Sequence, residues 1–269
     1  MRIIRLHQRG GVSMIVDAYA REMKAVGRSE NSIRTWRSYL DRLDAERDVL
    51  TMTNRDVLEW LADKNWAPAT RASARSALRS FFAWLVEAGY REDDPSVKIK
   101  PIRVPPRPAR RASEEDVQAN LGRLSGSDRL MILLAAYGGL RRAEIANLHS
   151  ADVADGVMLV KGKGGKYRRV PIHPALEADL AAAVEQGGWV VKSATGGKAT
   201  PDAVGKRIQR ATGLGAHSLR HRFATTVYRS SHDLRAVQAL LGHSSIATTE
   251  RYVGIDDDDL SRAMMSMAG

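Results

Sequence analysis

The sequence has no cysteine among its 269 residues. Disulfide bonds, thiolate metal sites and cysteine nucleophiles are therefore excluded together. Long apolar runs are also missing, because no window approaches the roughly 18 consecutive apolar residues that span a membrane. The N-terminus, "MRIIRLHQRGG", contains no apolar stretch of signal-peptide length. These absences predict a soluble protein without a membrane partner, which fits a reducing cytosol.

Metal-ligating patterns are scarce as well. The run from Asp256 to Asp259 is consecutive rather than spaced along one helix face, and it is typical of a helix N-terminus. Without a spaced carboxylate or histidine cluster, we expect neither a metal nor another cofactor.

Positive charge is abundant. The chain has 42 Lys and Arg against 31 Asp and Glu, a net charge of +11. Because 43% of the residues are hydrophobic, the chain folds and is not a basic tail. A folded protein this basic most often binds a polyanion, and nucleic acid is the first candidate. A basic protein without such a partner is the alternative.

Prolines mark a boundary between two predicted domains. The stretch "DDPSVKIKPIRVPPRPARRAS" disfavours helix and carries many positive charges. We expect a helical domain over 1–94, a basic linker over 95–112 and a second domain over 113–269. The linker either crosses a phosphate backbone, through residues such as Arg107, Arg110 and Arg111, or is only solvated.

Four helices are predicted in the first domain. In "SMIVDAYAREMKAVG" an apolar face is formed by Val16, Tyr19, Met23 and Val26. Similar patterns follow in "SENSIRTWRSYLDRL", "TNRDVLEWLADK" and "APATRASARSALRSFFAWLVEAGY". Four such helices are typical of a small bundle.

The last of these helices carries three arginines at intervals of four residues. Arg71, Arg75 and Arg79 share one face, and no acidic residue follows any of them at i+4. An uncompensated arginine stripe favours contact with DNA phosphates, and a solvated helix face is the alternative.

The second domain reads as mainly helical with a small antiparallel sheet. "SEEDVQANLGRL" begins with a capping pattern, and "SDRLMILLAAYGGL" is apolar enough for a buried helix. "GVMLVKGKGGKYRRVPIH" predicts two strands joined by a tight turn, and helical patterns then resume to the end. The fold class is therefore mainly α.

Four stretches carry the residue types that phosphodiester chemistry requires. Arginines stabilise the charge of the transition state, and a general acid protonates the departing sugar oxygen. "GGLRRAEI" contributes Arg141, "KGKGGK" contributes Lys163, "HSLRHRF" contributes His217 and Arg220, and "LLGHSSIATTERYV" contributes His243 and Tyr252. Each stretch alone has an ordinary structural interpretation. The presence of all four in this order is what indicates an active site for phosphodiester chemistry.

That ordered set resembles the tyrosine recombinase, or phage integrase, family. The family pattern is an arginine in "GLR", a lysine in a β-hairpin, "HxLRH", and "LGHxxxxxTxxY". The resemblance covers about residues 113–255, and by architecture it extends to the helical first domain, which would then be a SAM-like core-binding domain. One departure is "RSSHDL", where the family pattern has a glycine in the turn before "DL".

The resemblance implies a role for each site residue. Arg141 and Arg220 would clamp the scissile phosphate, and His243 would hydrogen-bond a non-bridging oxygen. Lys163 would protonate the 5′ leaving oxygen, although Lys161 and Lys166 share the same turn. His217 would assist proton transfer to or from Tyr252, which would form a 3′-phosphotyrosyl bond without ATP or metal.

Glu144 follows Arg141 by three residues. It resembles the acidic residue that supports the family's active site, and it either holds an arginine in place or is a surface charge.

Membership would also imply partners. Protomers would clamp double-stranded DNA core (attachment) sites, pair as dimers and exchange strands as tetramers through a Holliday junction, in the cytoplasm or nucleoid of a bacterial host. With the first helix expected near Ser13, too few residues precede it for an arm-binding domain, which favours a compact integrase of a phage or mobile element. A Xer-type chromosome or plasmid dimer resolvase is the alternative. Two further alternatives are a type IB topoisomerase-like enzyme and a catalytically silent DNA-binding protein.

Overall fold

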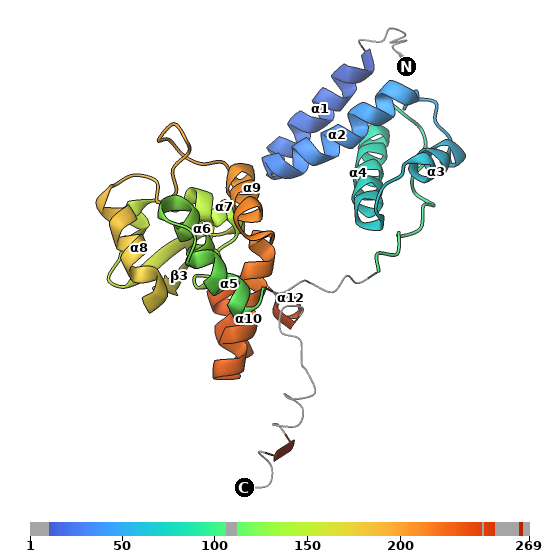
Figure 1. Ribbon diagram of the computed structural model, residues 1–269. Coiled ribbons are helices and arrows are strands. Elements are labelled where there is room, and N and C mark those ends of the chain that lie inside the picture. Colours follow the sequence, from blue (N-terminus) through green and yellow to red (C-terminus); the bar gives the residue numbers. More distant parts are fainter. Residues whose placement is uncertain (1–10, 106–111, 244, 251–263, 266–269) are drawn as a thin grey trace. The chain divides into compact units, whose positions relative to one another are not determined.

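The chain folds into two compact units, Met1–Arg107 and Pro108–Gly269. The computed structural model describes residues 11–105, 112–243, 245–250, 264 and 265 (Figure 1). The division lies within the linker expected over 95–112. Each unit has a hydrophobic core of its own.

The N-terminal unit is the expected group of four helices. Their bounds are α1 Gly11–Ala25, α2 Glu30–Glu46, α3 Asn54–Asp63 and α4 Pro68–Glu87 (Figure 1). Local sequence sets the ends: the Thr53 side chain accepts the Asp56 N–H while the Asp56 carboxylate accepts the Thr53 N–H. Gly89, just beyond α4, has the left-handed φ that glycine adopts without strain.

Large aromatic side chains fill the core of this unit. Trp60, Phe81 and Phe82 are fully buried together with Leu40 and Leu43, and each such side chain contributes about 1.5–3 kcal/mol of burial. The apolar face predicted for the first helix is confirmed at Val16, Tyr19 and Met23. Val26 was wrongly assigned to it, because the helix has ended by then and the side chain is 71% exposed.

The first residues of the expected linker pack against the N-terminal unit. Ile99 is buried in its core, and Ser96 is fully buried. Backbone carbonyls in this stretch accept hydrogen bonds from side chains on the helices. Asn54 on α3 donates to Pro95, Arg79 on α4 donates to Val97, and Arg75 on α4 donates to Ile99.

The second unit is mostly helical, as predicted. Its helices are α5 Glu114–Leu121, α6 Gly126–Ala136, α7 Arg142–Asn147, α8 Pro174–Glu185, α9 Pro201–Thr212, α10 Ala216–Ser231, α11 Leu234–Leu241 and α12 Ile246–Glu250. Helix α6 lies at the centre, and every residue from Leu130 to Ala136 is buried. In the described residues, no helix is long and apolar enough to cross a membrane.

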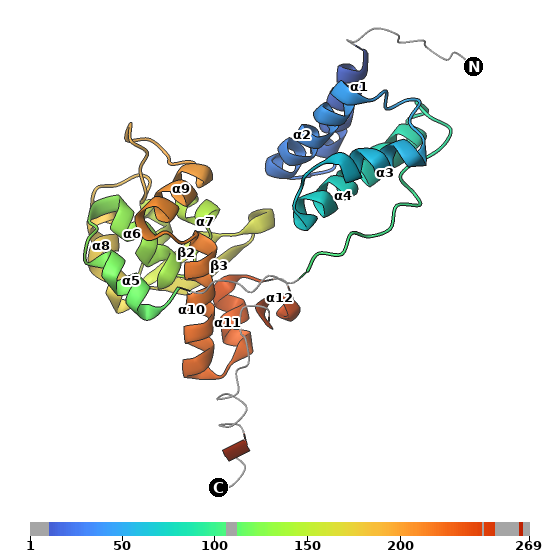
Figure 2. The same cartoon turned by 45° about the vertical axis from the view of Figure 1, so that its right-hand side comes forward.

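The expected hairpin is present in a three-stranded antiparallel sheet, counted over the described part of the chain. Strand β2, Val157–Lys161, pairs with β3, Tyr167–Pro171, and η2, Lys163–Gly165, forms the turn between them. Figure 2 shows the hairpin projecting from the helical body of the unit. The third strand, β1 Val153–Ala154, is too short to leave an alternating pattern in the sequence.

The unusual turn before α11 keeps a left-handed backbone without glycine. His232 caps α10 with φ 51° and ψ 18°, a conformation that glycine adopts at no steric cost and histidine tolerates better than most residues. Asp233 then begins α11 by accepting the N–H groups of Arg235 and Ala236. The turn between α10 and α11 therefore forms with His232 in the left-handed position.

Candidate active site

Arg141 is placed by a glycine turn at the start of α7. Gly139 has φ 64°, and a Cβ there would lie 2.5 Å from the Phe223 ring, so a side chain cannot fit. The turn makes Arg141 the residue that precedes the helix, and its backbone N–H donates to Glu144 at 2.9 Å. Its side chain remains 38% exposed.

Glu144 is the centre of an arginine cluster. Its side chain is only 4% exposed, and it accepts from Arg141 at 2.8 Å and from both terminal nitrogens of Arg168 at 2.8 and 2.9 Å. Arg220 lies 3.5 Å from the same carboxylate. Burial by itself would raise the pKa of Glu144, but the hydrogen bonds and charge of Arg168, with Arg141 and Arg220, hold it below its ordinary value. Of the two interpretations of Glu144, the structure therefore supports the one in which it holds arginines.

Arg220 on α10 is almost completely buried, with 1% of its side chain exposed. It donates to the carbonyl of Gly139, to the carbonyl of Leu241 at 2.6 Å, and to Nε2 of His243 at 3.1 Å. One guanidinium thus joins the Gly139 turn, α10 and the end of α11. Its planar fork is pre-organised before any ligand binds.

His243 is held just beyond α11 by a second glycine. Gly242 has φ 64°, and a Cβ on it would approach Cδ of Arg168 to 2.9 Å. The imidazole is 8% exposed, and its Nδ1 lies 3.0 Å from Oγ1 of Thr249 on α12. Burial, then the charges of Arg220, Arg141 and Arg168, lower the pKa of His243 to about 4. The ring is therefore neutral at pH 7.

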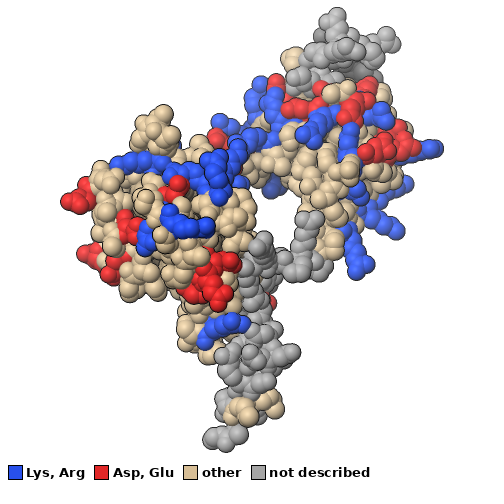
Figure 3. Space-filling view, in the orientation of Figure 1, with Lys and Arg blue, Asp and Glu red and all other residues tan. Residues whose placement is uncertain are grey.

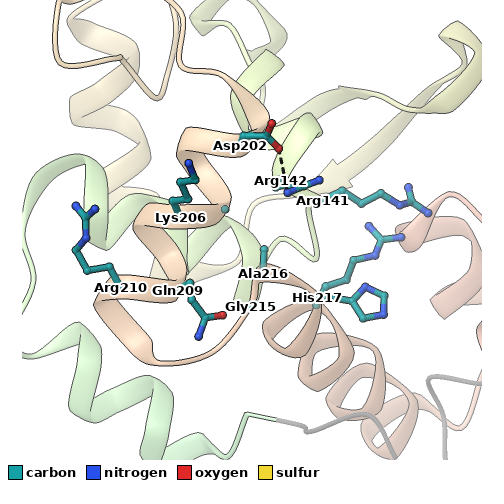
Figure 4. A pocket seen from close by; sticks show the side chains of 11 residues that line it. Arg141, Arg142, Asp202, Lys206, Gln209, Arg210, Gly215, Ala216 and His217 are labelled. Atoms are coloured by element: carbon teal, nitrogen blue, oxygen red, sulfur yellow. Dashed lines mark ion pairs between the residues drawn. The ribbon is translucent and has the colours of Figure 1, made fainter. Parts of the chain in front are cut away.

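A cleft opens beside these residues within the second unit. It has a volume of about 740 Å³, and Arg141, Arg220 and His217 line it together with Arg142, Lys206 and Arg210. Figure 4 shows Arg141 and His217 on one side of the cleft, with Lys206 and Arg210 of α9 on the other. Partial burial, then the charges of Arg220 and Arg141, lowers the pKa of His217. Figure 3 shows Lys and Arg side chains gathered over α9.

Lys163 begins the turn of the hairpin, as predicted. The turn closes when the Gly162 N–H donates to the Lys166 carbonyl at 2.8 Å. A Cβ on Gly162 would lie 3.9 Å from Oε1 of Glu144, so the base of the turn is next to the arginine cluster. The Lys163 side chain lies outside what the structure describes.

Several of the expected functional residues lie outside the described residues. They are Tyr252 and the linker arginines Arg107, Arg110 and Arg111.

The arginine stripe on α4 is present, but its guanidinium groups also hold backbone. Arg71 donates to the carbonyl of Trp66, Arg75 to that of Ile99 and Arg79 to that of Val97. All three side chains are half-buried. Contact between this stripe and DNA stays a prediction.

Two polar residues of the site were missed from sequence. Arg168 was available as a signal, because on β3 it lies on the same face as the buried Val170 and so occupies an inward position where a charge requires a partner. Thr249 is the threonine of the "LGHxxxxxTxxY" pattern, but the sequence by itself does not indicate a role for it. In the described part of the chain, no group of three His, Cys, Asp or Glu residues could hold a metal ion.

The chain matches two family models. The "Phage integrase family" matches residues 112–258, and the "Phage integrase, N-terminal SAM-like domain" matches residues 16–89. Among similar sequences is the tyrosine recombinase XerC of Neisseria gonorrhoeae, with 30% identity over 94% of each chain. The tyrosine recombinase XerD of Caulobacter vibrioides is 31% identical over 86% of this chain and 84% of its own.

Solved structures share the fold at lower identity. A lambda integrase dimer bound to a COC′ core site has a TM-score of 0.75 at 20% identity, covering 93% of this chain and 78% of its own. A lambda integrase tetramer bound to a Holliday junction also has a TM-score of 0.75, at 19% identity, over 90% of this chain and 77% of its own. At this identity the likeness is one of fold.

Proposed function

Because the chain belongs to the phage integrase family, whose model matches more than half of it, we propose that it is a site-specific DNA recombinase. It cleaves and rejoins double-stranded DNA by transesterification through a 3′-phosphotyrosyl intermediate. Two protomer pairs assemble on two sites and exchange strands through a Holliday junction.

One observation carries the proposal. Arg141 and Arg220 meet at the Glu144 carboxylate and line one cleft, and Arg220 contacts His243, although these residues are up to about a hundred positions apart in the sequence. The positive charges of Arg141 and Arg220 exceed the single negative charge of the buried Glu144 carboxylate, and a phosphate group would neutralise the excess positive charge. A surface of solvated arginines does not need such a buried support.

Arg141, Arg220 and His243 each have a distinct part in holding the scissile phosphate. The Arg141 side chain remains partly exposed where it lines the cleft, whereas Arg220 is fixed by hydrogen bonds to two backbone carbonyls. His243 adds a neutral hydrogen-bond donor. In a water-poor site, loss of one such donor typically costs about 10²- to 10³-fold in rate.

Protons must move at both ends of the broken bond. Tyr252 attacks phosphorus through its hydroxyl oxygen and loses its proton, which the neutral His217 can accept. Lys163 delivers a proton to the 5′ oxygen as it departs. The phosphotyrosyl bond conserves the energy of the phosphodiester, so the reverse attack by a 5′ hydroxyl reseals the strand.

DNA contacts extend beyond the cleft. We assign phosphate contacts to Arg71, Arg75 and Arg79 on α4 and to the linker arginines Arg107, Arg110 and Arg111. The lambda integrase structures, a dimer on a core site and a tetramer on a Holliday junction, support the same assembly here. With relatives from bacteria, we place the reaction in the bacterial cytoplasm, at the nucleoid.

The biological task is integration or excision of a phage or mobile-element genome. The second candidate is resolution of chromosome or plasmid dimers, which the full-length similarity to XerC and XerD favours. The two tasks differ in their sites by definition. A resolvase joins two copies of one site within a molecule, whereas an integrase joins a site on the element to a different site on the host.

The chemistry is tested by trapping the covalent adduct. A duplex with a nick near the cleavage point lets a short fragment diffuse away, so the protein stays attached and migrates slowly on denaturing gels. We expect adduct with the native chain and none with Tyr252→Phe, which should bind the same duplex equally well. Adduct formation by Tyr252→Phe would remove the nucleophile assignment, and binding without adduct by the native chain would indicate a silent DNA-binding protein.

The task is tested with reporter plasmids. Nuclease protection near the coding region would identify the site. A plasmid with two identical sites and a pair of plasmids with unlike sites are then compared. Recombination of the unlike pair supports integration, and recombination confined to identical sites supports resolution. Relaxation of supercoils without a site would instead point to a topoisomerase.

A further inference from the structure

The Thr249 hydroxyl lies against His243, the histidine that we propose binds the scissile phosphate. Thr249 is fully buried on α12, and its Oγ1 is 3.0 Å from Nδ1 of His243. The other ring nitrogen, Nε2, is 3.1 Å from Nη2 of Arg220. Both nitrogens of the ring therefore have a partner.

These two contacts determine where the proton sits. A guanidinium group can only donate, so Nε2 of His243 must accept from Arg220. In a neutral imidazole the other nitrogen then carries the hydrogen, and Nδ1–H donates to Oγ1 of Thr249. This is the wrong tautomer for catalysis, because Nε2 without a hydrogen cannot donate to a phosphate oxygen.

Two routes can put a hydrogen on Nε2 when DNA binds. In the first, the ring takes up a proton and becomes an imidazolium. Burial opposes this most, followed by the charges of Arg220 on α10, Arg141 before α7 and Arg168 on β3, whereas the charge of Glu144 favours it. In the DNA-free protein the pKa of about 4 keeps the ring neutral at pH 7, so this route requires DNA binding to raise that pKa.

In the second route the ring stays neutral. Nδ1 releases its proton to water, and Nε2 gains one from water, so that no net proton is taken up and the hydrogen bond from Arg220 to Nε2 is broken. The Thr249 hydroxyl turns and now donates its own hydrogen to Nδ1. A hydroxyl can do this because it both donates and accepts and its hydrogen rotates freely.

We propose that Thr249 is a positioning residue for His243. In the DNA-free protein its hydroxyl accepts a hydrogen bond from Nδ1–H, and on DNA it donates one to Nδ1. The neutral ring thereby changes tautomer, and Nε2–H binds the scissile phosphate. The inference depends on the proposed recombinase function for its DNA-bound half. Its DNA-free half concerns the protein alone. Thr249 stands three residues before Tyr252 in the sequence, so one threonine links the segment of the nucleophile to the phosphate site.

The tautomers are measured directly by nitrogen NMR with ¹⁵N-labelled histidine. The chain has seven histidines, and His243→Gln identifies the resonances of His243. In the DNA-free protein we expect Nδ1 protonated and Nε2 bare. In the Tyr252→Phe protein bound to its site we expect the reverse, with the ring still neutral. A protonated Nε2 without DNA, or two protonated nitrogens on DNA, would overturn the proposal.

Matched substitutions test the hydroxyl. Thr249→Val preserves shape and removes both hydrogen-bonding capacities, whereas Thr249→Ser retains them. We expect Thr249→Val to cleave about 10- to 100-fold more slowly, as for a buried polar group left without a partner, with DNA affinity unchanged, and Thr249→Ser to restore most of the rate. Thr212→Val is the control, since the Thr212 hydroxyl bonds only backbone groups of residues 208 and 214 among the described contacts.

The outcomes separate this inference from the function it depends on. Cleavage by Thr249→Val at the native rate would refute the role of Thr249 and leave the recombinase assignment intact. Absence of cleavage by the native chain would refute the recombinase assignment. The DNA-free spectrum would still decide whether Thr249 accepts the ring hydrogen bond, because Thr249→Val must then shift the Nδ1–H resonance. Thermal unfolding of each variant checks that the fold is retained.

Discussion

Replacing Glu144 with glutamine tests the arginine cluster most directly. The substitution preserves the shape of the side chain and one oxygen acceptor, but it removes the negative charge. Arg168 and Arg220, which are 10% and 1% exposed, then lose their carboxylate partner. Their charges are too buried for water to replace it.

The expected magnitude follows from that burial. Removing one partner of a buried ion pair typically costs about 3–5 kcal/mol, because the other charge stays behind. The glutamine oxygen still accepts one hydrogen bond, so we expect a loss near the lower end, about 3 kcal/mol of unfolding free energy. In a domain of this size each kcal/mol lowers the melting temperature by roughly 2–4 °C, so the fall should be about 6–12 °C.

The pH dependence has a definite sign. The pKa of Glu144 is lowered in the folded state, so its contribution to stability is complete above the unfolded value of 4.5. The contribution is lost as the pH falls through the lower, folded pKa. The difference in stability between the native chain and Glu144→Gln should therefore be constant near neutrality and shrink below about pH 4.5.

Scanning calorimetry of the full chain, with hydrogen exchange of peptides from α7 and α10, measures the effect in the second unit. Glu185→Gln, at an exposed carboxylate of α8, is the control and should change the unfolding free energy by less than about 0.5 kcal/mol. A Glu144→Gln protein within about 1 kcal/mol of the native chain would refute the reasoning. So would a difference that persists unchanged at acid pH, since the cluster would not then depend on the carboxylate charge.

Three further predictions concern the reaction and the assembly. Lys163→Ala should slow cleavage severely. A substrate with sulfur at the 5′ bridging position should restore cleavage, because a thiolate leaves without a proton. If sulfur instead rescues Lys161→Ala or Lys166→Ala, that lysine is the general acid. Substituting glutamine for Arg71, Arg75 and Arg79 should make the salt dependence of DNA binding shallower, since log K falls by about 0.9 per neutralised phosphate; an unchanged slope would mean that these arginines only hold the carbonyls of residues 66, 97 and 99. Ending the chain after Ile255 should preserve binding to one half-site and abolish cooperative pairing, because we expect the apolar positions 260, 264 and 267 of the tail to dock on the neighbouring protomer; full recombination on paired sites would show that the tail packs within its own chain.

Most of the elements could be predicted because their signals are local. A capping side chain bonds a backbone N–H only three residues away, so Thr53–Asp56 and Ser113–Asp116 mark the starts of α3 and α5 in the sequence itself. Apolar spacing likewise identifies the buried face of a helix, but it does not say where the helix ends. Val26 was misassigned for that reason.

Arg141, Arg220 and His243 could be named from the sequence as candidates for the site, since the order of the motifs is carried by the chain. Their arrangement could not be predicted. Glu144 contacts residues 24 and 76 positions away, and such a partnership leaves no period in the sequence. Until the chain folds, Glu144 is as compatible with a surface charge as with a buried support.

The sequence by itself determined the helices, the hairpin and the residues capable of phosphodiester chemistry, because each depends on neighbours within a few positions. Only the tertiary structure decided that Arg168 joins Glu144 and that Thr249 faces His243. It also decided that the stripe on α4 holds backbone carbonyls of residues 97 and 99. Those contacts form when separate elements pack together and bury polar groups, and burial is what compels each group to find a partner.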